Sequence, residues 1–99
     1  MKTREEILHF LYHNKSEILK RFHLVRIGLF GSFSRDDATP ESDVDILVDF
    51  DDKVKDVYTI KQSLRAYLSE NFGRSVDLAR EKYLKSYARE HIRNEAIYV

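Results

Sequence analysis

The chain has 99 residues, enough for a single domain (residues 1–99) with one modest hydrophobic core. Its 17 basic and 17 acidic residues cancel, so nucleic acid is disfavoured as a partner, and the lack of cysteine excludes disulfides and thiolate metal sites. The first residues lack the apolar core of a signal peptide, and no run nears the ~20 apolar residues that span a membrane. We therefore expect a cytoplasmic protein that does not enter the membrane.

Hydrophobic periodicity predicts helices and strands in the order α-β-β-α-β-α. The first element, residues 3–22, reads as an amphipathic helix opened by a capping box of Thr3 with Glu6. The further elements are strands over 25–30, 43–50 and 75–79 and helices over 57–72 and 81–98, with Gly73 ending the helix before it. This order predicts an α/β (α+β) fold, a small mixed sheet backed by helices.

Two aspartates open the strand over 43–50. Because side chains alternate along a strand, Asp43 and Asp45 share one face while Val44 and Ile46 point to the other. Carboxylates two residues apart lie roughly 6–7 Å apart, so their oxygens can converge on one ion or on a close pair of ions. Mg²⁺ prefers hard oxygen ligands of this kind and takes substrate phosphates at its other positions.

A glycine–serine turn follows the strand over 25–30. Gly31 lets the backbone approach a phosphate closely, and the turn's amides can donate to its oxygens. Ser32 supplies a hydroxyl, and Arg35 supplies a fixed charge that can fork onto a phosphate. A short helix over 32–35 would add further amide donors, whereas the alternative Walker loop is absent from the sequence.

The spacing of these parts resembles a known family. Gly31-Ser32, the segment 33–42 and then Asp43-Val44-Asp45 resemble the signature of the DNA polymerase β-like nucleotidyltransferases, and above all their minimal nucleotidyltransferase (MNT) domains. In that family a third carboxylate sits on a later strand, and the matching residue is Asp77. Whether Asp77 faces the other two depends on strand register. The chain also departs from the family pattern, since Asp36 stands where Gly often follows the arginine.

The resemblance implies roles for these residues. Asp43 and Asp45 would hold the metal that bridges the triphosphate of ATP, while Asp45 and Asp77 would hold a second metal, with Asp77 as a candidate base. Ser32 and Arg35 would position the β- and γ-phosphates. The acceptor hydroxyl would lie on a partner.

The resemblance also implies a partner. Minimal nucleotidyltransferase domains accompany a helical HEPN ribonuclease in a toxin–antitoxin module, in which the nucleotidyltransferase transfers AMP from ATP to a toxin tyrosine. The chain would then be an Mg²⁺-dependent protein adenylyltransferase and antitoxin, in a homo- or hetero-oligomer. Two alternatives stay open: an antitoxin that neutralises by binding alone, with a vestigial site, and a subunit of a nucleic-acid nucleotidyltransferase.

Charged residues also occur outside the motif, on the predicted helices 57–72 and 81–98. Lys61 and Arg65 lie one turn apart on the predicted helix 57–72 and reach a triphosphate only if that helix borders the site. The late part of the chain interleaves basic residues with Glu81, Glu90 and Glu95, which favours a solvated helix face over a nucleic-acid patch.

Overall fold

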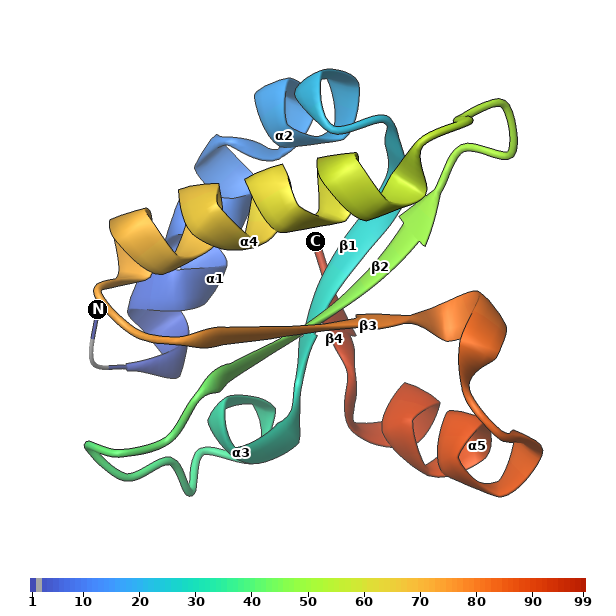
Figure 1. Cartoon of the computed structure of the whole chain (residues 1–99). Helices are drawn as coiled ribbons and strands as arrows, with labels where there is room; N and C mark the ends of the chain where they lie inside the picture. Colours follow the sequence, from blue (N-terminus) through green and yellow to red (C-terminus); the bar gives the residue numbers. More distant parts are fainter. Residues whose placement is uncertain (2) are drawn as a thin grey trace.

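The computed structural model describes residues 1 and 3–99, which fold around one four-stranded sheet in the order β3-β2-β1-β4 (Figure 1). β2 runs antiparallel to β1 and parallel to β3, while β4 pairs antiparallel with the outer edge of β1. The strands are β1 (Leu24–Phe30), β2 (Val44–Phe50), β3 (Val76–Arg80) and β4 (Ile97–Tyr98). The mixed sheet predicted from the sequence is confirmed.

Helices cover the two faces of this sheet unequally. Figure 1 shows α1 (Arg4–His13), α2 (Lys15–Arg21) and α4 (Val57–Phe72) on one face, with α3 (Gly31–Ser34) and α5 (Ser86–Glu95) toward the other. The hydrophobic core lies under the first group, where the inward side of β2 meets α4. Its members include Val44, Ile46, Val48, Leu64, Leu68 and Phe72. Within the described residues, no helix is long and apolar enough to cross a membrane.

The prediction of one helix over 3–22 is wrong in one respect, because the helix breaks at Asn14. The capping box of Thr3 with Glu6 is present. At the break, the Asn14 side-chain amide donates to the Phe10 carbonyl at 2.9 Å, so α1 ends and α2 begins there. A side chain that bonds its own backbone competes with helix propagation.

The prediction of one helix over 81–98 is also wrong. The segment contains a 3₁₀ turn, η1 (Glu81–Tyr83), then α5, and finally the edge strand β4. Ala96 is extended, and Ile97 and Tyr98 pair with Leu29 and Gly28 of β1. Ile97 and Tyr98, which both favour β-structure, therefore form a strand that pairs with the free edge of β1.

Candidate active site

The parallel register of β2 and β3 sets Asp45 directly beside Asp77. Neighbouring strands lie about 4.8 Å apart, so two side chains at one register position stand next to each other on one face. Val44, Ile46 and Val48 occupy the opposite, core face, which confirms the alternation expected for this strand. Asp43 immediately precedes β2 and is exposed, as is Asp77.

Gly31 lies against Asp45 so closely that only glycine fits. Its φ is +74°, and a Cβ built there would stand 2.1 Å from Asp45 Oδ2. Phe30, the residue before it, is paired with Asp45 across the β1–β2 ladder. The end of β1 therefore delivers the turn to the carboxylates, with the Asp45 oxygen packed on the glycine backbone.

Asp45 carries most of the electrostatic strain of the site. Burial, and next the charges of Asp77 and Asp43, raise the pKa of Asp45 from its ordinary value of 3.8 to about 6, while Arg35 opposes the rise. Three carboxylates thus repel one another around a half-buried central group, and a cation placed among them would relieve that repulsion.

The three aspartate side chains have the chemistry of metal ligands, but they do not form a preassembled coordination site. Among the described residues, no three His, Cys, Asp or Glu side chains are grouped as a ready-made metal site. Asp43 and Asp77 form no hydrogen bond or ion pair with any described residue, so both exposed side chains are free to reorient. Two or three carboxylates and a bound phosphate supply the oxygen ligands that Mg²⁺ prefers.

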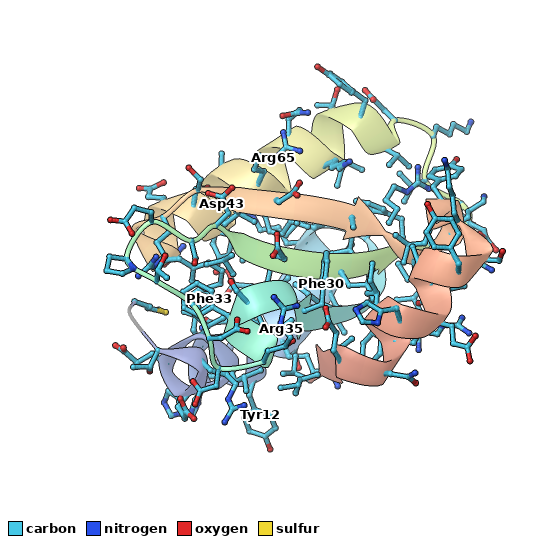
Figure 2. All side chains as sticks on the ribbon, turned by 90° about the horizontal axis from the view of Figure 1, so that it is seen from below. Tyr12, Phe30, Phe33, Arg35, Asp43 and Arg65 are labelled. Atoms are coloured by element: carbon cyan, nitrogen blue, oxygen red, sulfur yellow. The ribbon has the colours of Figure 1, made fainter. Side chains whose placement is uncertain are left out.

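The turn itself begins a short helix, α3, as expected. The Ser34 hydroxyl donates to the Gly31 carbonyl at 2.9 Å, and Arg35 ends the helix. Ser32 is partly exposed on the turn. Figure 2 views the molecule from the side of α3 and shows Arg35 projecting beside the sheet, with Asp43 at the start of β2.

A fourth carboxylate lies at the turn, and the sequence analysis assigned it elsewhere. Glu95, at the end of α5, accepts from the Gly31 amide at 3.2 Å and from Arg35 Nη1 at 3.1 and 3.3 Å. Its side chain is only 15% exposed, so the expectation of a solvated position is wrong for Glu95. Contacts across about 60 residues of chain leave no local sequence signal.

The backbone explains the departure at Asp36. Its φ is +62°, in the left-handed region where glycine is free of strain and aspartate is tolerated. Asp36 and Asp37 are both exposed, and Asp37 pairs with Arg35 Nε at 3.2 Å. The two added acids therefore lie at the outer side of the turn.

Arg74 holds the loop that leads to Asp43. Its Nη1 donates to the carbonyls of Thr39, Pro40 and Ser42 at 3.0 to 3.2 Å, and its guanidinium stacks over Phe33. One side chain thereby fixes the residues just before Asp43, a role that was not predicted from the sequence. An arginine with several carbonyl partners is recognisable only once the loop is folded.

Among the described residues, neither Lys61 nor Arg65 forms a hydrogen bond or ion pair with one of the site aspartates. α4 packs on the core face of the sheet, whereas Asp45 points to the opposite face. Arg65 donates to Gln62 of its own helix at 2.9 Å. The Lys61 and Arg65 side chains are both partly buried along α4.

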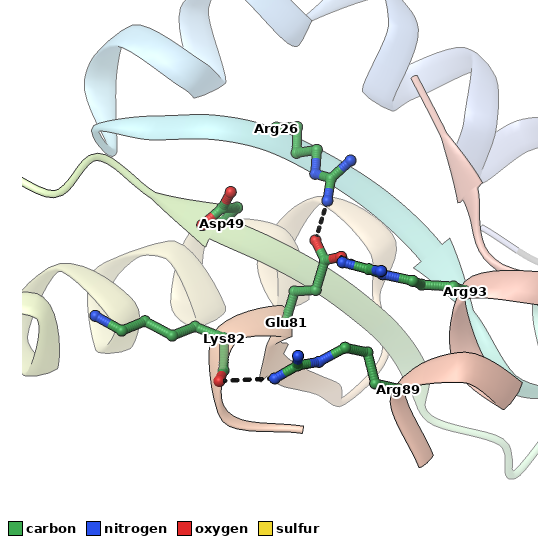
Figure 3. A pocket seen from close by; sticks show the side chains of 6 residues that line it. All are labelled: Arg26, Asp49, Glu81, Lys82, Arg89 and Arg93. Carbon is green, nitrogen blue, oxygen red and sulfur yellow. Dashed lines mark hydrogen bonds and ion pairs between the residues drawn. The ribbon is translucent and has the colours of Figure 1, made fainter. Parts of the chain in front are cut away.

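A polar pocket of about 330 Å³ lies at the other end of the sheet from the aspartates (Figure 3). It is lined by Arg26, Asp49, Glu81, Lys82, Arg89 and Arg93. Glu81 is 5% exposed and ion-paired with Arg26 and Arg93, so the solvated position expected for Glu81 is wrong as well. Burial acts to raise the pKa of Glu81, but hydrogen bonds from the two arginines outweigh it and lower the pKa. The pocket's central charge is therefore already neutralised within the fold.

Known proteins share the sequence and the fold of this chain. The nucleotidyltransferase domain model matches residues 14–99. The protein adenylyltransferase MntA of Thermococcus cleftensis is 40% identical over 99 residues, which cover all of this chain and 98% of that protein. A solved structure provisionally described as a minimal nucleotidyltransferase has a TM-score of 0.72 at 31% identity, over 95% of this chain and 86% of that one.

A more distant likeness concerns the fold alone. A chain in the complex of tri-AMPylated Shewanella oneidensis HEPN toxin with MNT antitoxin has a TM-score of 0.63 at 20% identity, over 91% of this chain and 69% of that one. The matches to the Thermococcus protein and to the minimal nucleotidyltransferase structure extend over nearly the whole chain, including the strands, turn and aspartates described above. The chain belongs to the nucleotidyltransferase domain family, and it is a nucleotidyltransferase of the minimal kind.

Proposed function

We propose that the chain is a protein adenylyltransferase that transfers AMP from ATP to a tyrosine hydroxyl of a helical HEPN toxin and thereby acts as its antitoxin. The observation that carries the proposal is the pairing of Asp45 with Asp77 beside the Gly31 turn. It is supported by the activity for which the Thermococcus relative is named and by the HEPN–MNT complex of like fold.

The chain's own residues would position the reactants. The Gly31 amide and Arg35 would hold the triphosphate, so that its α-phosphorus lies near the aspartates. The acceptor oxygen forms a bond to that phosphorus, the bond from phosphorus to the β-phosphate oxygen breaks, and pyrophosphate leaves. Asp77, exposed and without a partner among the described residues, would take the hydroxyl proton.

A divalent cation, Mg²⁺, would be held by Asp43, Asp45 and Asp77, and when bound it neutralises charge on the phosphates and lowers the pKa of a coordinated hydroxyl. The mutual repulsion of the carboxylates around Asp45 is the feature of the protein that suits it for this role. Without a bound cation, the repulsion among these three carboxylates would lower the stability of the fold.

The test is transfer of label from α-labelled ATP to the co-encoded helical partner in the presence of Mg²⁺. The double variant Asp43→Asn/Asp45→Asn removes two site carboxylates, and Asp52→Asn makes the same chemical change at an exposed position after β2. We expect label on the partner with the wild type and with Asp52→Asn, but none with the double variant. Replacing the modified tyrosine of the partner by phenylalanine should then abolish labelling.

The alternative of neutralisation by binding gives a different result. Wild type and double variant would then form the complex equally well, block the toxin equally well, and leave the partner unlabelled. Label that appears in RNA instead of protein would indicate a nucleic-acid nucleotidyltransferase.

A further inference from the structure

Glu95 occupies the place in the turn that an anion would take. Its carboxylate accepts from the Gly31 amide and from the Arg35 guanidinium, the two donors assigned above to a nucleotide phosphate. Both Glu95 oxygens are used, and the side chain is largely buried. A carboxylate and a phosphate compete for such donors because both present oxygens with negative charge.

The helix that carries Glu95 is held chiefly by polar contacts. Over its residues 86–95, α5 has no fully buried side chain. Among the described residues, the other side-chain bonds of α5 run from Arg93 to the buried Glu81 and from Arg89 to the carbonyls of Lys82, in η1, and Leu84, directly after it (Figure 3). The Glu95 end of α5 can therefore move from α3 without exposing a fully buried α5 side chain, while the pairing of Ile97 with β1 holds the residues that follow.

The charges around Glu95 also favour its release when a phosphate arrives. Glu95 lies close enough to Asp45 to act on it electrostatically, with Arg35 as the cation near both. Arg35 is the arginine that pairs with Glu95 within the part of the chain that the structure describes, so a phosphate that binds Arg35 would remove that partner, with the exposed His91 3.9 Å away. The carboxylate would then be repelled from the site.

We propose that Glu95 is a displaceable stand-in for the nucleotide phosphate, so that nucleotide binding unfastens the C-terminal end of α5 from the Gly31–Arg35 turn. This inference rests on the proposed function, since it takes the turn to be the triphosphate site. The position of α5 would then differ between the nucleotide-free and the nucleotide-bound protein. Glu95 competes with the substrate and does not take part in the transfer.

The test compares Glu95→Gln with Glu90→Gln, which makes the same change of net charge at an exposed position of the same helix. Affinity for ATP with Mg²⁺ is measured by calorimetry. Because the Arg35 partner of the Glu95 ion pair is 47% exposed, the pair should stabilise by up to about 1 kcal/mol, and removing the competitor should tighten ATP binding up to about fivefold. We expect this gain for E95Q and none for E90Q.

The outcomes separate this inference from the proposed function. If the wild type binds ATP and E95Q binds it no more tightly, or more weakly, the proposed role of Glu95 is overturned while the proposed function stands. Failure of both proteins to bind ATP overturns the proposed function and the inference with it. If E95Q does not fold, amide hydrogen exchange of the wild type decides. Faster exchange in α5 on adding ATP supports the displacement, and unchanged or slower exchange overturns it.

Discussion

Replacing Asp45 by asparagine should abolish transfer and yet stabilise the fold at neutral pH. Burial, and then Asp77 and Asp43, raise the pKa of Asp45 from 3.8 to about 6, so its ionised form is unfavourable in the folded protein. That interval corresponds to about 3 kcal/mol. Solvent screening at this half-buried position reduces the expected gain to about 1–2 kcal/mol. Asparagine keeps the size of the side chain and removes the charge.

The effect has a definite pH dependence. The folded protein holds the Asp45 proton more tightly than the unfolded chain does. The stability that the wild type gains from this protonated Asp45 is therefore complete below pH 3.8 and is lost as pH rises through about 6. The free energy of unfolding is measured by urea denaturation of wild type and Asp45→Asn at pH 5 and pH 7.5. We expect the variant's advantage at pH 5 to be about half of its value at pH 7.5, where it should reach about 1–2 kcal/mol, or about 5–10 °C in Tm.

A matched control and a cation complete the experiment. Asp52→Asn, at an exposed position, should change the free energy of unfolding at neither pH. Mg²⁺ should stabilise the wild type at pH 7.5 and have less effect on Asp45→Asn, because a ligand stabilises the state that binds it. The reasoning is refuted if Asp45→Asn is less stable than the wild type at pH 7.5, since Asp45 would then contribute favourable contacts to the fold.

Four further substitutions test separate parts of the structure, the first three by urea denaturation and the fourth by amide hydrogen exchange. Gly31→Ala should lose roughly 2 kcal/mol or more and impair transfer, because its φ is +74° and the new Cβ would meet the Asp45 carboxylate at 2.1 Å; unchanged stability would contradict the close approach. Asp36→Gly should gain about 0.5 kcal/mol at a φ of +62°, and a loss would show that the side chain matters more than the backbone. Glu81→Gln should cost about 3 kcal/mol at neutral pH. Despite burial, its arginine partners lower the pKa of Glu81, so this cost should shrink as pH falls through that lowered pKa, and a cost independent of pH would exclude the ion pair as its source. Arg74→Met should free the loop before β2, seen as faster amide exchange over residues 39–42, with transfer reduced and the core unchanged; equal exchange in both proteins would rule out a role of Arg74 in holding the loop.

The sequence predicts those features that depend on neighbouring residues. Alternation along 43–50 gives the strand and the shared face of Asp43 and Asp45, and Gly73 ends α4 in the left-handed conformation expected of a helix-terminating glycine. The helix expected over 81–98 fails for the opposite reason. Whether Ile97 and Tyr98 form a strand depends on a free edge of β1, which no local pattern reveals.

The pairings that make the site are long-range in the same way. Asp77 could be placed on a late strand, but its position beside Asp45 depends on the β2–β3 register. Glu95 and Glu81 read as members of a charged helix surface, yet each is held by arginines from elsewhere in the chain. Charge alternation along a segment cannot distinguish a solvated acid from a buried ion pair, because the two differ only in what the fold brings to them.

Three strained features lie at one end of β1 and β2, whereas the left-handed His23 stands just before the other end of β1. The left-handed Gly31, the left-handed Asp36 and the half-buried Asp45 lie within one turn and its neighbouring strand, whereas the core under α4 consists of well-packed apolar side chains. Local rules of stability are most often broken where a site needs a geometry that folding alone would not select. Substitutions that relieve the charge at Asp45 should therefore raise stability and lower transfer, while Asp36→Gly, which relieves strain on the outer side of the turn, should raise stability and leave transfer intact. That contrast between two nearby stabilising changes distinguishes strain required by the chemistry from strain that the chain merely tolerates.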